Sequence, residues 1–210
     1  MDDLILKAHK YAYNEGSKII RGLGQPLYIV ATEWDHIQGV VKLYAEGLNY
    51  DTKYDTVINE NDLMLWQKDS LIIAYLHDSL EDWPNFTYER LRDEFGEYVA
   101  NSVRKLTISK GEDRFDAISR RMLHDSETCI IKTMDRLENI IFAAKCYKYL
   151  KKRRKQFEYD EWISQIEKLI KYKEETIRIW SRSYDTRMMA YINLDVYIST
   201  IMNIALTQFN

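Results

Sequence analysis

The chain has 210 residues, of which 46% are hydrophobic, so it is long enough to bury one substantial core, and a single domain is the default expectation. Its 30 basic and 33 acidic residues give a formal charge of −3. This near balance excludes a general electrostatic attraction to nucleic acid or anionic lipid, so any anionic ligand must be met by a local cluster of cations.

The expected elements are helices, because the chain has only 2 prolines and 7 glycines and its apolar residues recur at three- and four-residue spacing. Strand signals are almost absent. In chain order the expected helices cover residues 2–20, 28–45, 62–82, 88–95, 98–106, 114–123, 126–150, 159–181 and 186–206. The fold class is therefore predicted to be all-α.

Local signals predict several helix ends. The helix at 62–82 should end before Pro84, because proline disfavours helix in the residue that precedes it. Thr87 is expected to cap the N-terminus of the next helix, and Gly96 is expected to end it. These signals place short connections between neighbouring helices.

Two cysteines, Cys129 and Cys146, lie in the helix expected at 126–150. At about 1.5 Å per residue they are separated by roughly 25 Å, which excludes a disulfide between them. Unpaired thiols, together with the absence of a charged-then-apolar leader and of a long apolar run, favour a cytoplasmic protein with no membrane partner.

Residues 1–150 are expected to form one domain and residues 151–210 a C-terminal helical extension. An apolar stripe on the first helix of this extension must be buried against the core or against a second copy of the chain. The sequence does not choose between these, so a homodimer is left open. The stripe consists of Ile163, Ile166, Ile170, Ile177 and Trp180.

Four side chains that can bind metals lie at the end of the helix expected at 62–82: His77, Asp78, Glu81 and Asp82. At about 100° per residue they fall within an arc of about 140°. Three carboxylates at such short separations repel one another unless a cation lies among them. A ligand set of imidazole and carboxylate groups suits Mn²⁺, Fe²⁺, Mg²⁺ or Zn²⁺. The alternative is a plain helix end with surface carboxylates, because His-Asp pairs also occur by chance.

A second polar pair interrupts the helix expected at 126–150. Asp135 and Asn139 are four residues apart and share a face of this largely apolar helix. A carboxylate on a buried face is costly unless a cation matches it. The alternative is a surface ion pair between Asp135 and Arg136.

Three segments together resemble the hydrolase domain of the RelA/SpoT family and its small stand-alone alarmone hydrolases, within the HD superfamily of phosphohydrolases. They are residues 74–82 (AYLHDSLED), 87–107 (TYERLRDEFGEYVANSVRKLT) and 131–139 (IKTMDRLEN). Their order and spacing match the family over roughly residues 8–145. The resemblance implies an HD-domain helical bundle, to which this chain adds two C-terminal helices.

By this resemblance one divalent ion, most often Mn²⁺ in the family, is expected on His36, His77, Asp78 and Asp135. The match at His36 is imperfect, because the family histidine follows a Tyr-Ile pair closely and residues 30–35 intervene in this chain. His124, in a second His-Asp pair, is expected to be structural or exposed.

The resemblance also implies roles around the metal. Glu81 and Asp82 match the acid/base carboxylates, and a carboxylate near a divalent ion can accept the proton of a water molecule that attacks phosphorus. Arg21 and Lys110 match positions expected to contact phosphate, and Asn139 matches a position on the nucleoside side of the pocket.

The implied function is hydrolysis of a nucleotide phosphoester, foremost removal of the 3′-pyrophosphate of (p)ppGpp to give GDP or GTP and pyrophosphate. Ile141 stands where the family usually has an arginine, and the stretch at 49–61 looks longer than usual. These departures leave two alternatives: an HD phosphohydrolase of another nucleotide, or a catalytically silent HD protein that binds a nucleotide. The expected partner in each case is a small nucleotide and no nucleic acid.

Overall fold

The computed structural model describes residues 3–21, 31–48, 50–51, 56–57, 65–109, 111–112, 125–152, 159–187 and 192–207. Helices dominate this part of the chain, so the predicted all-α fold class is confirmed. The helices are α1 (Asp3–Gly16), α2 (Glu33–Leu48), α3 (Leu65–Leu76), α4 (Ser79–Asp82), α5 (Tyr88–Phe95), α6 (Glu97–Leu106), α8 (Ser126–Lys152), α9 (Tyr159–Arg187) and α10 (Ile192–Thr207).

Two short antiparallel ladders accompany the helices. β1 (Ile20–Arg21) pairs with β2 (Ala31–Thr32), and β3 (Tyr50–Asp51) pairs with β4 (Thr56–Val57). Each strand has two residues, too few to give a periodic signal in the sequence. The β1–β2 ladder matters for the site because it holds Arg21 beside the start of α2.

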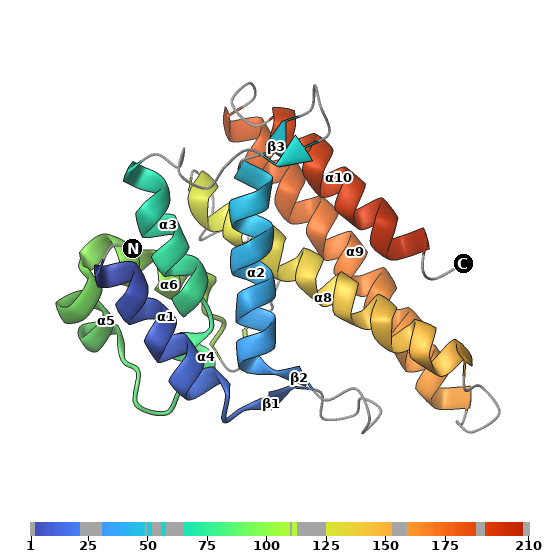
Figure 1. Cartoon of the computed structure of the whole chain (residues 1–210), viewed down its shortest axis with the longest axis horizontal. Coiled ribbons are helices and arrows are strands. Elements are labelled where there is room, and N and C mark those ends of the chain that lie inside the picture. The colour runs from blue at the N-terminus through green and yellow to red at the C-terminus, as the bar shows by residue number, and fades with distance from the viewer. Residues whose placement is uncertain are drawn as a thin grey trace.

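Helix α2 lies in the centre of the fold (Figure 1). On one side of it lie α1, α3, α5 and α6, and on the other lie α9 and α10, while α8 crosses α2 and reaches both groups (Figure 1). α2 packs against α1, α3, α8 and α10. Its side chains therefore meet those of α3 and α8 in the interior.

A reciprocal cap sets the start of α2. The Thr32 hydroxyl accepts a hydrogen bond from the Asp35 backbone N–H at 3.3 Å, and the Asp35 carboxylate accepts one from the Thr32 backbone N–H at 2.7 Å. Such a capping box satisfies the free donors of a helix N-terminus. The expected range of 28–45 is therefore wrong, since residues 31–32 form β2 and the helix continues to Leu48. The cap puts Glu33 in the first turn and His36 one turn later.

The single helix expected at 62–82 is also wrong. α3 ends just before His77 and Asp78, which form a turn, and α4 follows. The His77 ring nitrogen Nδ1 lies 2.8 Å from the Ala74 carbonyl oxygen, and such a side-chain bond competes with the next backbone bond of the helix. The four ligand-capable side chains are thus gathered by a turn and not along one helical arc.

The predicted caps around α5 are confirmed. Trp83 is extended before Pro84 and ends α4. The Thr87 hydroxyl accepts a hydrogen bond from the Arg90 backbone N–H at 3.2 Å. Gly96 ends the helix with a φ of 90°, a conformation that residues with a Cβ rarely adopt.

The C-terminal helices lie on the core. α9 packs along α8, and α10 packs against α8 and α2. The predicted apolar stripe is only partly buried: Trp180 is buried, whereas Ile170 and Ile177 are 53% and 50% exposed in the single chain. The buried face of α9 is turned slightly from the predicted one and includes Leu169 and Ile179.

Cys129 and Cys146 are free and buried in α8, and burial raises the pKa of Cys146 to about 11. Within the described ranges no helix is long and apolar enough to span a membrane. Lys110, His124 and the helix expected at 114–123 lie outside the described residues.

Candidate metal centre and active site

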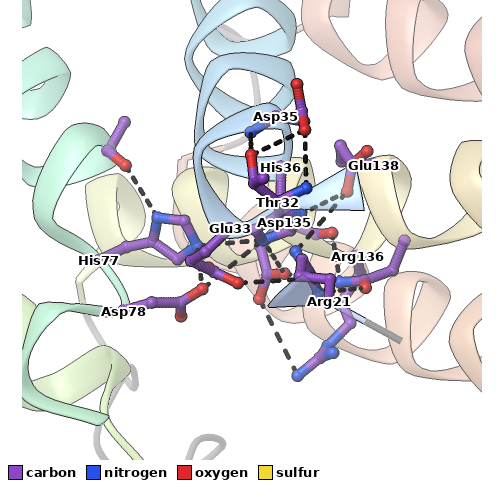
Figure 2. Close-up of polar contacts among 12 residues, drawn as sticks. Arg21, Thr32, Glu33, Asp35, His36, His77, Asp78, Asp135, Arg136 and Glu138 are labelled. Carbon is purple, nitrogen blue, oxygen red and sulfur yellow. Dashed lines mark hydrogen bonds and ion pairs between the residues drawn. The ribbon is translucent and has the colours of Figure 1, made fainter. Parts of the chain in front are cut away.

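Two histidines from different elements face each other in the interior. His36 comes from α2 and His77 from the turn after α3, and their Nε2 atoms lie 3.3 Å apart (Figure 2). The His77 Nδ1 lies beside the Ala74 carbonyl, and the His36 Nδ1 contacts the Glu138 carboxylate. Because each Nδ1 meets an acceptor, we assign a proton to it, which leaves the lone pair of each Nε2 directed at the other histidine.

Two aspartates complete this cluster. Asp78 Oδ2 lies 3.0 Å from His77 Nε2 and 3.6 Å from His36 Nε2, and Asp135 Oδ1 lies 3.3 Å from His36 Nε2. Ligand atoms at about 2.1 Å from one divalent ion lie roughly 3.0–3.4 Å apart, close to these spacings. Three of the four predicted ligands, His36, His77 and Asp78, therefore have ligand atoms within 4.8 Å of one another, at spacings that fit a divalent ion, and Asp135 meets this group through His36.

The charges of the cluster are set by its neighbours. Burial alone would raise the pKa of Asp135, but Lys132 and Arg136 hold it well below its usual range. Burial would likewise raise the pKa of Asp78, and the adjacent His77 outweighs this and lowers it. Burial lowers the pKa of His77, yet Asp78 and Asp135 together raise it above its ordinary value. Both aspartates are therefore ionised, and a divalent ion would compete with a proton for the His77 Nε2.

Two buried cations flank Asp135 on α8. Lys132 Nζ lies 2.7 Å from Asp135 Oδ2, and Arg136 Nη2 lies 3.9 Å from the same oxygen. Arg136 also pairs with Glu175 of α9, with 3.0 Å between Nε and Oε2. The alternative of a surface pair between Asp135 and Arg136 is wrong, because both side chains are buried.

Glu138 orients His36 from behind. Its carboxylate contacts the His36 Nδ1, and it crosses the face of α2 at Gly39, where an added Cβ would lie 2.6 Å from the Glu138 Cγ. Burial raises the pKa of Glu138 to about 7, and the carboxylate of Asp135 acts in the same direction. A carboxylate on the second nitrogen of a ligand histidine fixes its tautomer and ring orientation.

Glu81 and Asp82 lie on the exposed rim beside this cluster, on α4. The Glu81 Oε1 accepts a hydrogen bond from the Ile108 backbone N–H at 2.6 Å. Burial raises the pKa of Glu81 above its ordinary value, although Lys132 opposes the shift. A carboxylate with a raised pKa beside this cluster of candidate metal ligands is suited to accepting a proton.

Arg21 and Asn139 are joined to each other. Arg21 Nη2 donates to Asn139 Oδ1 at 2.9 Å, and Asn139 Nδ2 donates to Asp135 Oδ1 at 2.7 Å. Arg21 Nη1 is buried and has no hydrogen-bond partner. Asn139, predicted to contact the nucleoside, thus positions Asp135 and Arg21. The N–H donors on Arg21 Nη1 make no hydrogen bond and could bind an anion.

Glu33 is a further buried carboxylate in the site. Its Oε2 lies 3.5 Å from Arg21 Nε, and its side chain is 4% exposed (Figure 2). Burial raises its pKa to about 10, with the charge of Asp78 acting in the same direction. Residues of this kind are held in protein interiors only where a proton, a cation or a donor matches them.

Most of these groups, though not His36, His77 or Glu138, line one cavity of about 250 Å³. Its lining contains five carboxylates against three cationic side chains, so it is short of positive charge until a cation binds. The lining residues are Arg21, Glu33, Asp78, Glu81, Asp82, Ile108, Lys132, Asp135, Arg136, Asn139 and Tyr172.

Glu33, Lys132 and Glu138 belong to the site but are not marked by the motifs in the sequence. Lys132 and Glu138 each lie three residues from Asp135 on α8, so the helical spacing could have marked them as neighbours of that ligand. The capping box at the start of α2 could have placed Glu33 and His36 one turn apart on the same helix. Tyr172 lines the cavity from α9, and no sequence pattern indicates which tail residue does so.

No protein-family model and no curated protein matches this sequence. Among solved structures, the chain is similar to a metazoan ortholog of SpoT that is described as hydrolysing ppGpp and as playing a role in starvation responses. The TM-score is 0.54 and the identity is 15%, over 95% of this chain and 96% of the other. A likeness at this identity concerns the fold. At that level it confirms the expected resemblance: the chain shares the all-α fold of that SpoT-like protein.

Proposed function

We propose that this chain is a metal-dependent phosphohydrolase that removes the 3′-pyrophosphate of (p)ppGpp. The observation that carries the proposal is the cluster of His36 Nε2, His77 Nε2 and Asp78 Oδ2, three acceptor atoms whose spacing fits one divalent ion. We propose Asp135, whose Oδ1 lies 3.3 Å from His36 Nε2, as the fourth ligand. The fold it shares with a protein described as hydrolysing ppGpp supports the choice of substrate.

His36, His77, Asp78 and Asp135 would hold the ion, for which we propose Mn²⁺ because mixed nitrogen and oxygen ligands suit it. When bound, such an ion lowers the pKa of a water molecule and offsets negative charge on phosphoryl oxygens. The protein's own contribution is to keep both aspartates ionised and to direct both Nε2 lone pairs inward.

Glu81 is proposed as the proton acceptor. The attacking water loses a proton as its oxygen bonds to phosphorus, and the bond between phosphorus and the 3′ oxygen breaks. The Ile108 N–H holds the Glu81 carboxylate on the rim, and its raised pKa improves it as a base near neutral pH. The proton taken by Glu81 is proposed to pass to the 3′ oxygen, and Asp82, on the same rim, is proposed to hold the attacking water in place.

The cationic side of the cavity is proposed to receive the pyrophosphate. Arg21 Nη1 is a buried donor with no hydrogen-bond partner, since the Glu138 oxygen with which it pairs lies 4.0 Å away, and a phosphate oxygen would satisfy it. Lys132 and Arg136 line the same cavity. Lys110 stays a prediction from the sequence, as do the cytoplasmic location and the small-nucleotide partner.

The test is to incubate the purified chain with Mn²⁺ and either ppGpp or GTP and to resolve the products by ion-exchange chromatography. We expect ppGpp to yield GDP and intact pyrophosphate, and GTP, which has no 3′ substituent, to be a poor substrate. Asp78→Ala should abolish both Mn²⁺ binding and turnover, whereas Asp93→Asn, on the exposed face of α5, should leave both unchanged. Orthophosphate as the product from ppGpp would contradict the proposal.

A second candidate is an HD phosphohydrolase of another nucleotide. The Asn139 amide is already bonded to Asp135 and Arg21, and Ile141, two residues further along α8, stands where the family usually has an arginine. The nucleoside side of the pocket therefore differs from the family pattern. Efficient cleavage of GTP with ppGpp untouched would favour this candidate, and no cleavage by Mn²⁺-loaded protein would favour a binding-only role.

A further inference from the structure

The buried carboxylate of Glu33 is only half satisfied by the protein. Its Oε2 faces Arg21 Nε at 3.5 Å, but its Oε1 is buried without a hydrogen-bond partner. Arg21 is also shared, since its Nη2 is bonded to Asn139 and its Nη1 lies 4.0 Å from Glu138. A buried carboxyl oxygen that meets neither a donor nor a cation is unfavourable. The position of Oε1 therefore points to a ligand.

Two further carboxylates converge on Glu33. Oxygen atoms of Glu33, Asp78 and Asp82 all lie within 4.8 Å of one another. Asp78 belongs to both groups of ligand atoms, because its Oδ2 also faces His77 Nε2 and His36 Nε2. Figure 2 shows Glu33 and Asp78 side by side, with His77 beyond them.

We propose that Glu33, Asp78 and Asp82 form a second divalent-cation site, and that the Asp78 carboxylate bridges it to the histidine site. Three carboxylates and no nitrogen make a hard oxygen site, which suits Mn²⁺ or Mg²⁺. Two-metal phosphohydrolase centres place their ions about 3.5–4 Å apart, a separation that one bridging carboxylate can span.

The charge of the cavity supports two ions. Five carboxyl groups line it against three cationic side chains, so with all five ionised one divalent ion only brings the lining to neutrality. A pyrophosphate group would then enter without a net attractive charge. A second divalent ion leaves the lining positive and suited to a highly charged phosphate substrate.

This inference rests on the proposed metal-dependent hydrolase but is tested by stoichiometry and not by turnover. The metal-free full-length chain is titrated with Mn²⁺, and bound ions per chain are counted by calorimetry and by electron paramagnetic resonance. We expect two ions, of which the second binds more weakly, and loss of the isolated six-line Mn²⁺ signal as the pair becomes exchange-coupled. Glu33→Gln should bind one ion, with the second weakened at least about 10-fold.

Asp82→Asn provides a second variant that does not depend on a buried substitution, because Asp82 is exposed, and it too should bind one ion. Asp93→Asn should bind two, as the wild type does. One ion per wild-type chain at saturating Mn²⁺, or two in both Glu33→Gln and Asp82→Asn, overturns the second site. Hydrolysis of ppGpp by a protein that binds one ion would leave the proposed function standing while ending this inference.

Discussion

At the scale of single residues, the orientation of His36 depends on a missing side chain. Gly39 lets the Glu138 carboxylate reach the His36 Nδ1, since a Cβ at this position would lie 2.6 Å from Glu138 Cγ. We expect Gly39→Ala to weaken Mn²⁺ binding about 10–100-fold, because the partner that fixes a ligand histidine is displaced. Calorimetric titration of the metal-free protein with Mn²⁺ measures this.

Two comparisons make this prediction specific. Glu138→Ala should weaken binding to a similar extent, and the double variant should be little worse than either single one, because both remove the same contact. Gln38→Ala adds alanine at the exposed neighbouring position of α2 and should bind Mn²⁺ normally. Wild-type affinity in Gly39→Ala would show that Glu138 does not orient the ligand.

Glu81 separates proton transfer from metal binding. In Glu81→Gln the amide oxygen can still accept the Ile108 N–H, but the side chain can no longer take a proton. We expect turnover to fall about 10²–10⁴-fold with Mn²⁺ content unchanged. Steady-state kinetics alongside elemental analysis test this, with Glu89→Gln on the exposed face of α5 as the control. Near-normal turnover in metal-loaded Glu81→Gln would contradict the role.

The metal ligands could be predicted from their residue types and from the family resemblance. The neighbouring carboxylates that orient these ligands and complete the cavity could not. His77, Asp78 and Asp135 stand in motifs that can be recognised in the sequence. The partners Glu138 and Glu33 act across elements: Glu138 through the space left at Gly39, and Glu33 through the β1–β2 ladder that holds Arg21 beside the start of α2. Contacts between distant elements depend on packing, which a linear pattern does not encode.

At the scale of elements, one carboxylate fastens α1 to α5. Glu94 of α5 accepts from Tyr11 at 2.7 Å and pairs with Lys7 at 3.0 Å, both on α1, and with Arg90 at 2.8 Å. Burial alone would raise the pKa of Glu94, but Arg90, Tyr11 and Lys7 together lower it to about 2. The stabilisation is therefore complete above the ordinary pKa of 4.5 and is lost as the pH falls towards 2.

We therefore expect Glu94→Gln to lower the free energy of unfolding at pH 7 by about 1 kcal/mol, because Lys7 and Arg90 are partly exposed and water screens their charges. The difference from wild type should shrink as the pH falls from 5 to 3, when Glu94 begins to bind a proton. Urea unfolding at several pH values measures it, with Glu174→Gln on the exposed face of α9 as the control. A difference that stays constant with pH would show that the charge is not responsible.

Helices with strong local signals were predicted within a few residues, and those governed by competing local bonds were not. α5 and α6 follow the expected caps at Thr87 and Gly96. The prediction of a continuous helix at 62–82 was wrong because the His77 ring nitrogen bonds to the Ala74 carbonyl oxygen. The predicted start of α2 was wrong because Thr32 and Asp35 cap each other. Both breaks lie at the candidate metal centre, where function and regular helix geometry compete.

At the scale of the whole molecule, α8 links the metal centre to the C-terminal helices. It packs against α2, α3 and α6 as well as α9 and α10. Asp135 faces the cluster from this helix, and the next residue, Arg136, is paired with Glu175 of α9. A boundary between residues 150 and 151 would thus separate the two partners of a buried ion pair, and Tyr172 of the extension lines the same cavity.

We expect α8 and α9 to unfold together. Leu169, Ile179 and Trp180 are buried on α9, and the side chains of Arg136 and Glu175 are 7% and 4% exposed, so detaching α9 would expose apolar surface and leave Arg136 buried without its partner. Breaking such a pair costs about 3–5 kcal/mol. Hydrogen exchange measured against urea should therefore give the most protected amides of both helices the same opening free energy. Glu175→Ala should lower both values by a similar amount, whereas Glu174→Gln, on the exposed face of the same helix, should change neither. If the amides of α9 opened at far lower free energy than those of α8, or if Glu175→Ala loosened α9 alone, residues 151–210 would be an appendage that folds separately from the metal centre.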